Sequence, residues 1–171
     1  GEQVWRETLE PGAVLLRVAR THVRMGTIEH FAGNPVAMAQ LLSWFADRHL
    51  PGARPVDIFE NCVLRTAEMI AGWMSLGFVH GVMNTDNMLI SGETIDYGPC
   101  AFMDEFKFDQ VFSSIDRNGR YSYKNQPSIA IWNLARLAES LIPIVSLEES
   151  ESIKLFEKSL ENISVKDFVL S

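Results

Sequence analysis

The feature that most constrains this chain is a pair of motifs separated by a short turn. His80 to Asn87 reads His-Gly-Val-Met-Asn-Thr-Asp-Asn, and Asp96-Tyr97-Gly98 begins nine residues after Asn87. Strand-like runs on either side of Ser91-Gly92-Glu93 are typical of a tight hairpin. Such a hairpin would bring the Asn87 amide and the Asp96 carboxylate together. Because hard oxygen ligands suit a divalent ion that bridges nucleotide phosphates, the pattern predicts a metal site.

The rest of the chain is predicted to be mainly helical. Asn34 is a typical N-cap followed by proline, and Gly77 is a typical C-terminal stop. Apolar periodicity and these end signals predict helices over about residues 35–49, 56–76, 127–143 and 147–162. The short β-branched run at 12–19 predicts a strand, and residues 104–126 are expected to be irregular.

This order of elements resembles the helical lobe of a kinase-like protein. There, a long helix leads into a loop that ends in Asn, and a β-hairpin then ends in an Asp-aromatic-Gly triplet, both of which bind metal. The expected fold class is therefore α+β and mostly helical, corresponding to the C-lobe portion of a protein-kinase-like fold with a short β-hairpin at the metal site.

The sequence departs from the kinase pattern at one informative position. Kinases place a base Asp two residues after the loop His, and here that position is Val82. Valine cannot accept a proton, which argues against ordinary phosphoryl transfer to a hydroxyl. Another carboxylate, Asp86, stands directly before Asn87.

Longer stretches carry a more specific resemblance. Residues 80–88 and 94–99, together with Pro11 to Glu29 and Gly119 to Ala138, are similar to motifs of the SelO (YdiU) family of protein adenylyltransferases. The resemblance extends over about residues 1–143. The segment beyond, residues 144–171, reads only as an acidic helical tail.

The resemblance implies transfer of AMP from ATP to Ser, Thr or Tyr hydroxyls of protein substrates. By position, Asp86 would be the catalytic acceptor of the hydroxyl proton, and Asn87 and Asp96 would hold Mg²⁺ or Mn²⁺. Arg17 and Arg24 match the nucleotide-binding arginines of the family, and an arginine fork suits phosphate oxygens. His80 is expected to brace the backbone.

The family's glycine-rich loop and nucleotide-anchoring Lys would lie upstream of residue 1. No glycine-rich phosphate loop occurs among the 171 residues. The chain is therefore expected to be a single partial domain, residues 1–171, without its N-terminal lobe. In isolation it should bind ATP weakly and transfer AMP poorly or not at all.

Composition limits the classes of partner that the chain can bind. The formal net charge of −7 argues against a nucleic-acid binder, and the absence of a long apolar run argues against a membrane-spanning segment. Cys62 and Cys100 show no metal-binding spacing. These features and the resemblance predict a cytoplasmic protein of bacterial type, with a mitochondrial location also compatible.

Two other functions are weighed against protein adenylylation. An aminoglycoside- or choline-kinase-like phosphotransferase also has a loop that begins with His-Gly, but it carries Asp where this chain has Val82. A non-catalytic pseudokinase module would act by binding proteins. The presence of Asp86, Asn87 and Asp96 argues against loss of metal binding.

Overall fold

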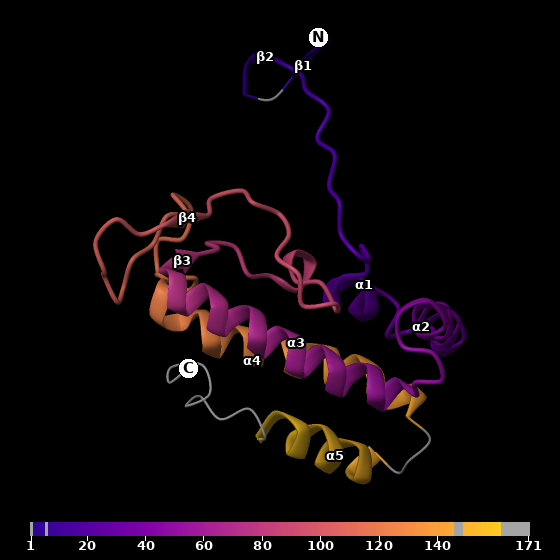
Figure 1. The fold of residues 1–171 in the computed structure, drawn as a ribbon. Coiled ribbons are helices and arrows are strands. Elements are labelled where there is room, and N and C mark those ends of the chain that lie inside the picture. Colours follow the sequence, from indigo (N-terminus) through magenta and orange to yellow (C-terminus); the bar gives the residue numbers. More distant parts are fainter. Residues whose placement is uncertain (1, 6, 146–148, 162–171) are drawn as a thin grey trace.

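The computed structural model describes residues 2–5, 7–145 and 149–161. Two long helices, α3 (Pro55–Leu76) and α4 (Gln126–Leu141), pack against each other at the centre of the molecule (Figure 1). Helix α5 (Glu149–Glu161) packs against both of them, and α2 (Pro35–His49) contacts the 3₁₀ turn η3 (Ile142–Ile144) that follows α4.

The predicted helix boundaries are confirmed within one or two residues. The Asn34 side chain accepts a hydrogen bond of 3.1 Å from the Ala37 main-chain N–H at the start of α2. Gly77 ends α3 in the left-handed region with φ of 66°, which glycine adopts without strain. Residues 147, 148 and 162 of the last predicted helix lie outside the described residues.

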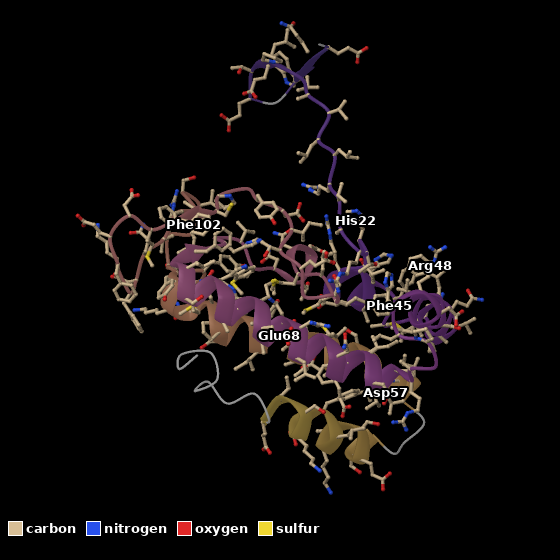
Figure 2. All side chains as sticks on the ribbon, viewed as in Figure 1. His22, Phe45, Arg48, Asp57, Glu68 and Phe102 are labelled. Atoms are coloured by element: carbon tan, nitrogen blue, oxygen red, sulfur yellow. The ribbon has the colours of Figure 1, made fainter. Side chains whose placement is uncertain are left out.

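One core joins the helices. Phe59 of α3, Leu134 of α4 and Phe156 of α5 are almost fully buried, and the rings of Phe59 and Phe156 meet edge to face at 4.8 Å. On α2, Phe45 is buried while Arg48 is exposed (Figure 2). In the acidic tail, the charged side chains of Glu151, Glu157 and Glu161 are likewise exposed. The apolar faces of the helices thus form the core, and the charged faces remain in solvent.

The strand predicted over residues 12–19 is wrong. These residues are extended but pair with no strand of the described structure, and Val14 is 99% exposed. The strands lie elsewhere, in an antiparallel hairpin of β1 (Gln3–Trp5) and β2 (Leu9–Pro11) that projects from the helices (Figure 1). A β-branched run favours extended backbone, but a strand also needs a partner edge. Only Gly12 meets one, donating its main-chain N–H to the Glu2 carbonyl at 2.8 Å, and residues 13–19 pair with no strand of the described structure.

The predicted metal hairpin is present, but its two arms pair at a single position. Met88 and Thr94 form a single antiparallel bridge, and the Gly92 main-chain N–H donates to the Leu89 carbonyl at 3.1 Å across the turn. Gly92 lies against α3, where a β-carbon would come within 2.6 Å of the Arg65 main chain. The turn therefore needs glycine both for its φ of 67° and for its contact with the helix.

Three elements near the hairpin, one helix and two strands, were not predicted. The short helix α1 (Met25–His30) is joined to it by a hydrogen bond of 2.8 Å from the Met25 main-chain N–H to the Met88 carbonyl. Strands β3 (Phe78–Val79) and β4 (Ala101–Phe102) pair antiparallel at the end of α3. The residues between β3 and β4 thus form one long connecting segment that contains both motifs.

The observed class is α+β, as predicted, and its two-stranded sheets are antiparallel. The likeness to a kinase C-lobe stays a prediction. Among the described residues, no helix combines the length and the apolar character needed to cross a membrane.

Candidate active site

His80 fixes the start of the loop that carries Asp86 and Asn87. Its ring is fully buried and stacks on Trp73 at 5.3 Å. Nε2 donates to the Ile95 carbonyl at 2.8 Å, which leaves Nδ1 to accept from the Val82 main-chain N–H at 3.4 Å. Burial lowers the pKa of His80, so the neutral ring is favoured. His80 therefore links the loop to the residue before Asp96, which agrees with the expected bracing role.

Helix α4 holds the same loop through two buried amides. The Gln126 side chain accepts from the His80 main-chain N–H at 3.0 Å and donates to the Phe78 carbonyl at 2.9 Å. The Asn133 side chain donates to the Met83 carbonyl at 2.8 Å. Sequence reasoning missed both residues. For Asn133 the signal was a polar amide on the largely apolar face of a predicted helix, where an unpaired amide would be costly. Gln126 precedes that predicted helix and carried no such signal.

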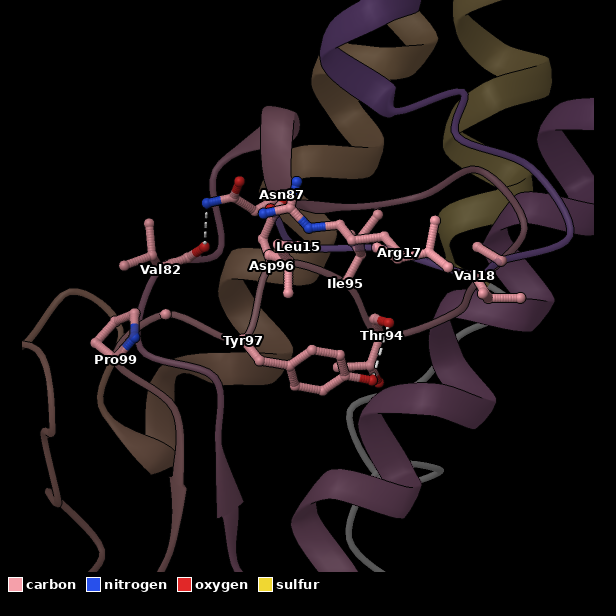
Figure 3. A pocket seen from close by; sticks show the side chains of 13 residues that line it. Leu15, Arg17, Val18, Val82, Asn87, Thr94, Ile95, Asp96, Tyr97 and Pro99 are labelled. Atoms are coloured by element: carbon pink, nitrogen blue, oxygen red, sulfur yellow. Dashed lines mark hydrogen bonds and ion pairs between the residues drawn. The ribbon is translucent and has the colours of Figure 1, made fainter. Parts of the chain in front are cut away.

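Asn87 and Asp96 line one pocket with a volume of about 590 Å³ (Figure 3). The Asn87 side-chain N–H donates to the Val82 carbonyl at 2.9 Å. A carbonyl only accepts, so this bond fixes the amide and leaves its oxygen available. Asp96 has a positive φ of 60°, which is rare outside glycine and is held here by the surrounding contacts. The structure thus brings the two predicted metal ligands to one pocket.

Both predicted nucleotide-binding arginines converge on Asp96. Arg17 Nη2 lies 2.6 Å from one carboxylate oxygen of Asp96, and Arg24 Nη2 lies 3.0 Å from the other. Arg17 comes from the extended segment before α1, and Arg24 is the residue that caps α1. Arg20, between them in the sequence, is exposed, and its main-chain N–H donates to the Glu93 carboxylate at 3.2 Å.

Asp86 lies on the 3₁₀ turn η1 (Thr85–Asn87), with its side chain exposed. It lies against Gly26 of α1, where a β-carbon would come within 3.1 Å of the Asp86 main-chain nitrogen. Next to it, the Thr85 hydroxyl donates to the Glu29 carboxylate at 2.8 Å. Helix α1 therefore supports the turn that presents Asp86 and Asn87.

The donor set fits a divalent ion that takes most of its ligands from phosphate and water. Among residues 2–5, 7–145 and 149–161, no group of three or more His, Cys, Asp or Glu side chains could hold a metal. An amide oxygen and a carboxylate at one pocket are what Mg²⁺ needs from a protein when a nucleotide completes its shell. Two arginines beside them carry the positive charge that phosphate oxygens would need. Together these features define a candidate site for a metal–nucleotide complex.

Comparisons with known proteins identify the family of the chain. The sequence model of the family described as protein adenylyltransferase SelO matches residues 1–166, and the chain belongs to this family. The chain is 50% identical over 170 residues to protein nucleotidyltransferase YdiU of Halalkalibacterium halodurans, covering 95% of this chain and 35% of that relative. The protein of the same name from Rhodopseudomonas palustris BisB5 is 50% identical over 167 residues, covering 94% and 34%.

A third relative, protein nucleotidyltransferase YdiU of Geobacillus kaustophilus, is 51% identical over 168 residues, covering 94% of this chain and 35% of the relative. The chain therefore spans about a third of the length of the curated relatives it matches.

Proposed function

We propose that the full-length protein containing this chain is a protein adenylyltransferase, which transfers AMP from ATP to Ser, Thr or Tyr hydroxyls of proteins. The observation that carries the proposal is that Arg17, Asn87 and Asp96 line one pocket and that Arg24 contacts Asp96 there. The family description and the names of the relatives point in the same direction. We further propose that the chain forms a kinase-like helical lobe and acts in the cytoplasm.

The binding roles follow from the donor types. Arg17 and Arg24 would turn from Asp96 to the triphosphate, because a guanidinium fork matches phosphate oxygens as well as it matches a carboxylate. Asn87 and Asp96 would then hold Mg²⁺ or Mn²⁺. When bound, the ion would neutralise part of the negative charge of the phosphates.

Asp86 is the proposed proton acceptor. The acceptor hydroxyl oxygen forms a bond to the α-phosphorus, the bond from that phosphorus to the bridging oxygen of pyrophosphate breaks, and the hydroxyl proton passes to the Asp86 carboxylate. Asp86 is exposed on η1 and held by its contact with Gly26, which leaves its oxygens within reach of a bound protein substrate. Val82 cannot perform this step, although it stands where kinases have their base.

Isotopic labelling tests the proposal directly. The full-length protein is incubated with Mn²⁺ and ATP labelled at either the α- or the γ-phosphate, and labelled protein is measured. We expect transfer of the α-label only. Transfer of the γ-label would instead identify a phosphotransferase, and no transfer would favour a binding module.

A further inference from the structure

A second hollow lies directly beside the proposed nucleotide pocket. Its volume is about 420 Å³, and it is lined by Val82 and Asn84 of the motif loop and by residues from Ser113 to Tyr121. Val82 lines both hollows. We call this second hollow the acceptor groove. A molecule bound in it would lie next to the loop that presents Asp86.

The wall of the acceptor groove is firmly built. The Asp116 carboxylate accepts hydrogen bonds from the main-chain N–H groups of Arg120 at 2.9 Å and Tyr121 at 2.8 Å. The Tyr121 hydroxyl donates to the Asn84 side-chain oxygen, which ties the wall to the motif loop. The groove is thus a formed surface, and its geometry is coupled to the loop of Asp86.

The charge of the groove is opposite to that of the chain. Arg117 and Arg120 line it in a chain of formal net charge −7. Within the described part of the chain, neither arginine forms an ion pair, and Asp116 is the sole carboxylate among the lining residues. Asp116 offsets only one of the two positive charges, so the lining residues keep a net positive charge.

Aromatic rings hold one of these arginines in place. The Arg120 guanidinium lies 4.8 Å from the Trp132 ring centre and 5.6 Å from that of Tyr121. Stacking leaves the edge of the guanidinium, with its N–H donors, free to bind a carboxylate. The groove therefore presents oriented donors for an anionic partner.

We propose that this groove binds the protein substrate through acidic residues that flank the hydroxyl to be modified. This inference rests on the proposed function. Glu or Asp side chains of the substrate would pair with Arg117 and Arg120, while the hydroxyl reaches past Val82 toward Asp86. These charges also favour the encounter of an acidic substrate with the groove, because the negatively charged remainder of the chain repels acidic segments and the groove attracts them.

Peptide binding tests the inference without requiring catalysis. The anisotropy of a labelled peptide with a central Ser and flanking Glu residues is compared with that of the same peptide carrying Lys, using the full-length protein without nucleotide. We expect the Glu peptide to bind at least about tenfold more tightly, with weaker binding at higher ionic strength. The double variant Arg117→Glu/Arg120→Glu should lose that preference or reverse it.

The matched control is Arg48→Glu on α2. Arg48, which is labelled in Figure 2, lies over the Trp44 ring at 4.8 Å, the same distance as Arg120 from Trp132. It does not line the groove. This variant should bind the Glu peptide as the parent does. If the charge-reversed protein does not fold, Arg117→Gln/Arg120→Gln supplies the same test with a smaller expected loss.

Equal binding of the Glu and Lys peptides, or an equal loss in the control, would overturn the inference. The inference would also be overturned if a single-stranded oligonucleotide displaced the labelled peptide as effectively as unlabelled Glu peptide does. That result would indicate a nucleic-acid site. α-Label transfer without any preference for acidic peptides would overturn the groove assignment alone. Acidic-peptide binding without α-label transfer would overturn the proposed function, and with it the groove's role in presenting a hydroxyl.

Discussion

Gly26 lies directly against Asp86, so that a β-carbon at position 26 would come within 3.1 Å of both the carboxyl carbon and the main-chain nitrogen of Asp86. Helix α1 begins one residue earlier and is hydrogen-bonded to the end of the motif loop. The position of the proposed proton acceptor therefore depends on the absence of a side chain on a neighbouring helix.

Gly26→Ala should displace Asp86 and reduce AMP transfer by about 10²-fold, because misplacement by about 1 Å has effects of that size. The matched control is Gly72→Ala within α3, where an added β-carbon would meet no atom within 4 Å. That variant should gain about 0.5–1 kcal/mol of stability from helix propensity and keep its activity. Initial rates with α-labelled ATP and thermal unfolding give both quantities. Full activity in Gly26→Ala would refute the role of this contact.

Arg17→Ala and Arg24→Ala should each weaken ATP binding. A hydrogen bond to a charged group contributes about 1.5–3 kcal/mol, or roughly 10- to 150-fold in the dissociation constant. Arg20→Ala is the internal control, since Arg20 lies between them in the sequence but, in the described part of the chain, forms no ion pair with Asp96. Calorimetric titration of the full-length protein with ATP separates the three variants. An equal loss in all of them would mean that net charge, and not these contacts, governs binding.

Asp96→Asn should abolish AMP transfer while keeping the side-chain volume and the tolerance for the positive φ of 60° at this position. The amide lacks the negative charge that a metal ligand supplies and that Arg17 and Arg24 contact. Mn²⁺ binding followed by electron paramagnetic resonance in the presence of ATP should weaken in parallel. Retained transfer in this variant would contradict the assignment of Asp96 to the metal.

Acidification should destabilise the fold through His80, whose pKa is lowered from the ordinary value of 6.5, chiefly by burial. Below about pH 6.5 the unfolded chain binds a proton that the folded ring resists, so the free energy of unfolding falls as the pH decreases. The melting temperature, measured at decreasing pH below about 6.5, should fall in the parent protein and fall less steeply in the His80→Gln variant. The exposed His22 provides the control, and a His22→Gln variant that flattened the profile instead would contradict the prediction.

The two thiols should differ in reactivity. Cys62 is fully buried, and burial raises its pKa to about 12, so almost no thiolate forms at neutral pH. Cys100 is only half-buried. Timed alkylation with iodoacetamide and mass spectrometry should therefore find Cys100 modified first, with Cys62 protected until the protein is unfolded. Early labelling of Cys62 would show that the helical core opens under native conditions.

Local sequence determined most of the helical structure. Asn34-Pro35 and Gly77 set helix ends where the structure has them, because a helix is built from bonds between residues four apart and its end signals lie within one turn. The spacing from Asn87 to Asp96 also indicated a shared site, since a short turn leaves few ways to separate its two ends. In contrast, the β-branched run at 12–19 could not reveal that no partner strand lies beside it in the described structure.

The tertiary structure decided which distant side chains meet. Motif resemblance singled out Arg17, Arg24 and Asp96 separately, but their ion pairs form only because the segment before α1 runs antiparallel beside the hairpin, where Arg24 pairs with Leu89. The contacts of Gly26 with Asp86 and of Tyr121 with Asn84 have no local signature at all. The physical reason is that burial and hydrogen bonding between segments far apart in the sequence depend on how whole helices and loops pack, which no short stretch of residues encodes by itself.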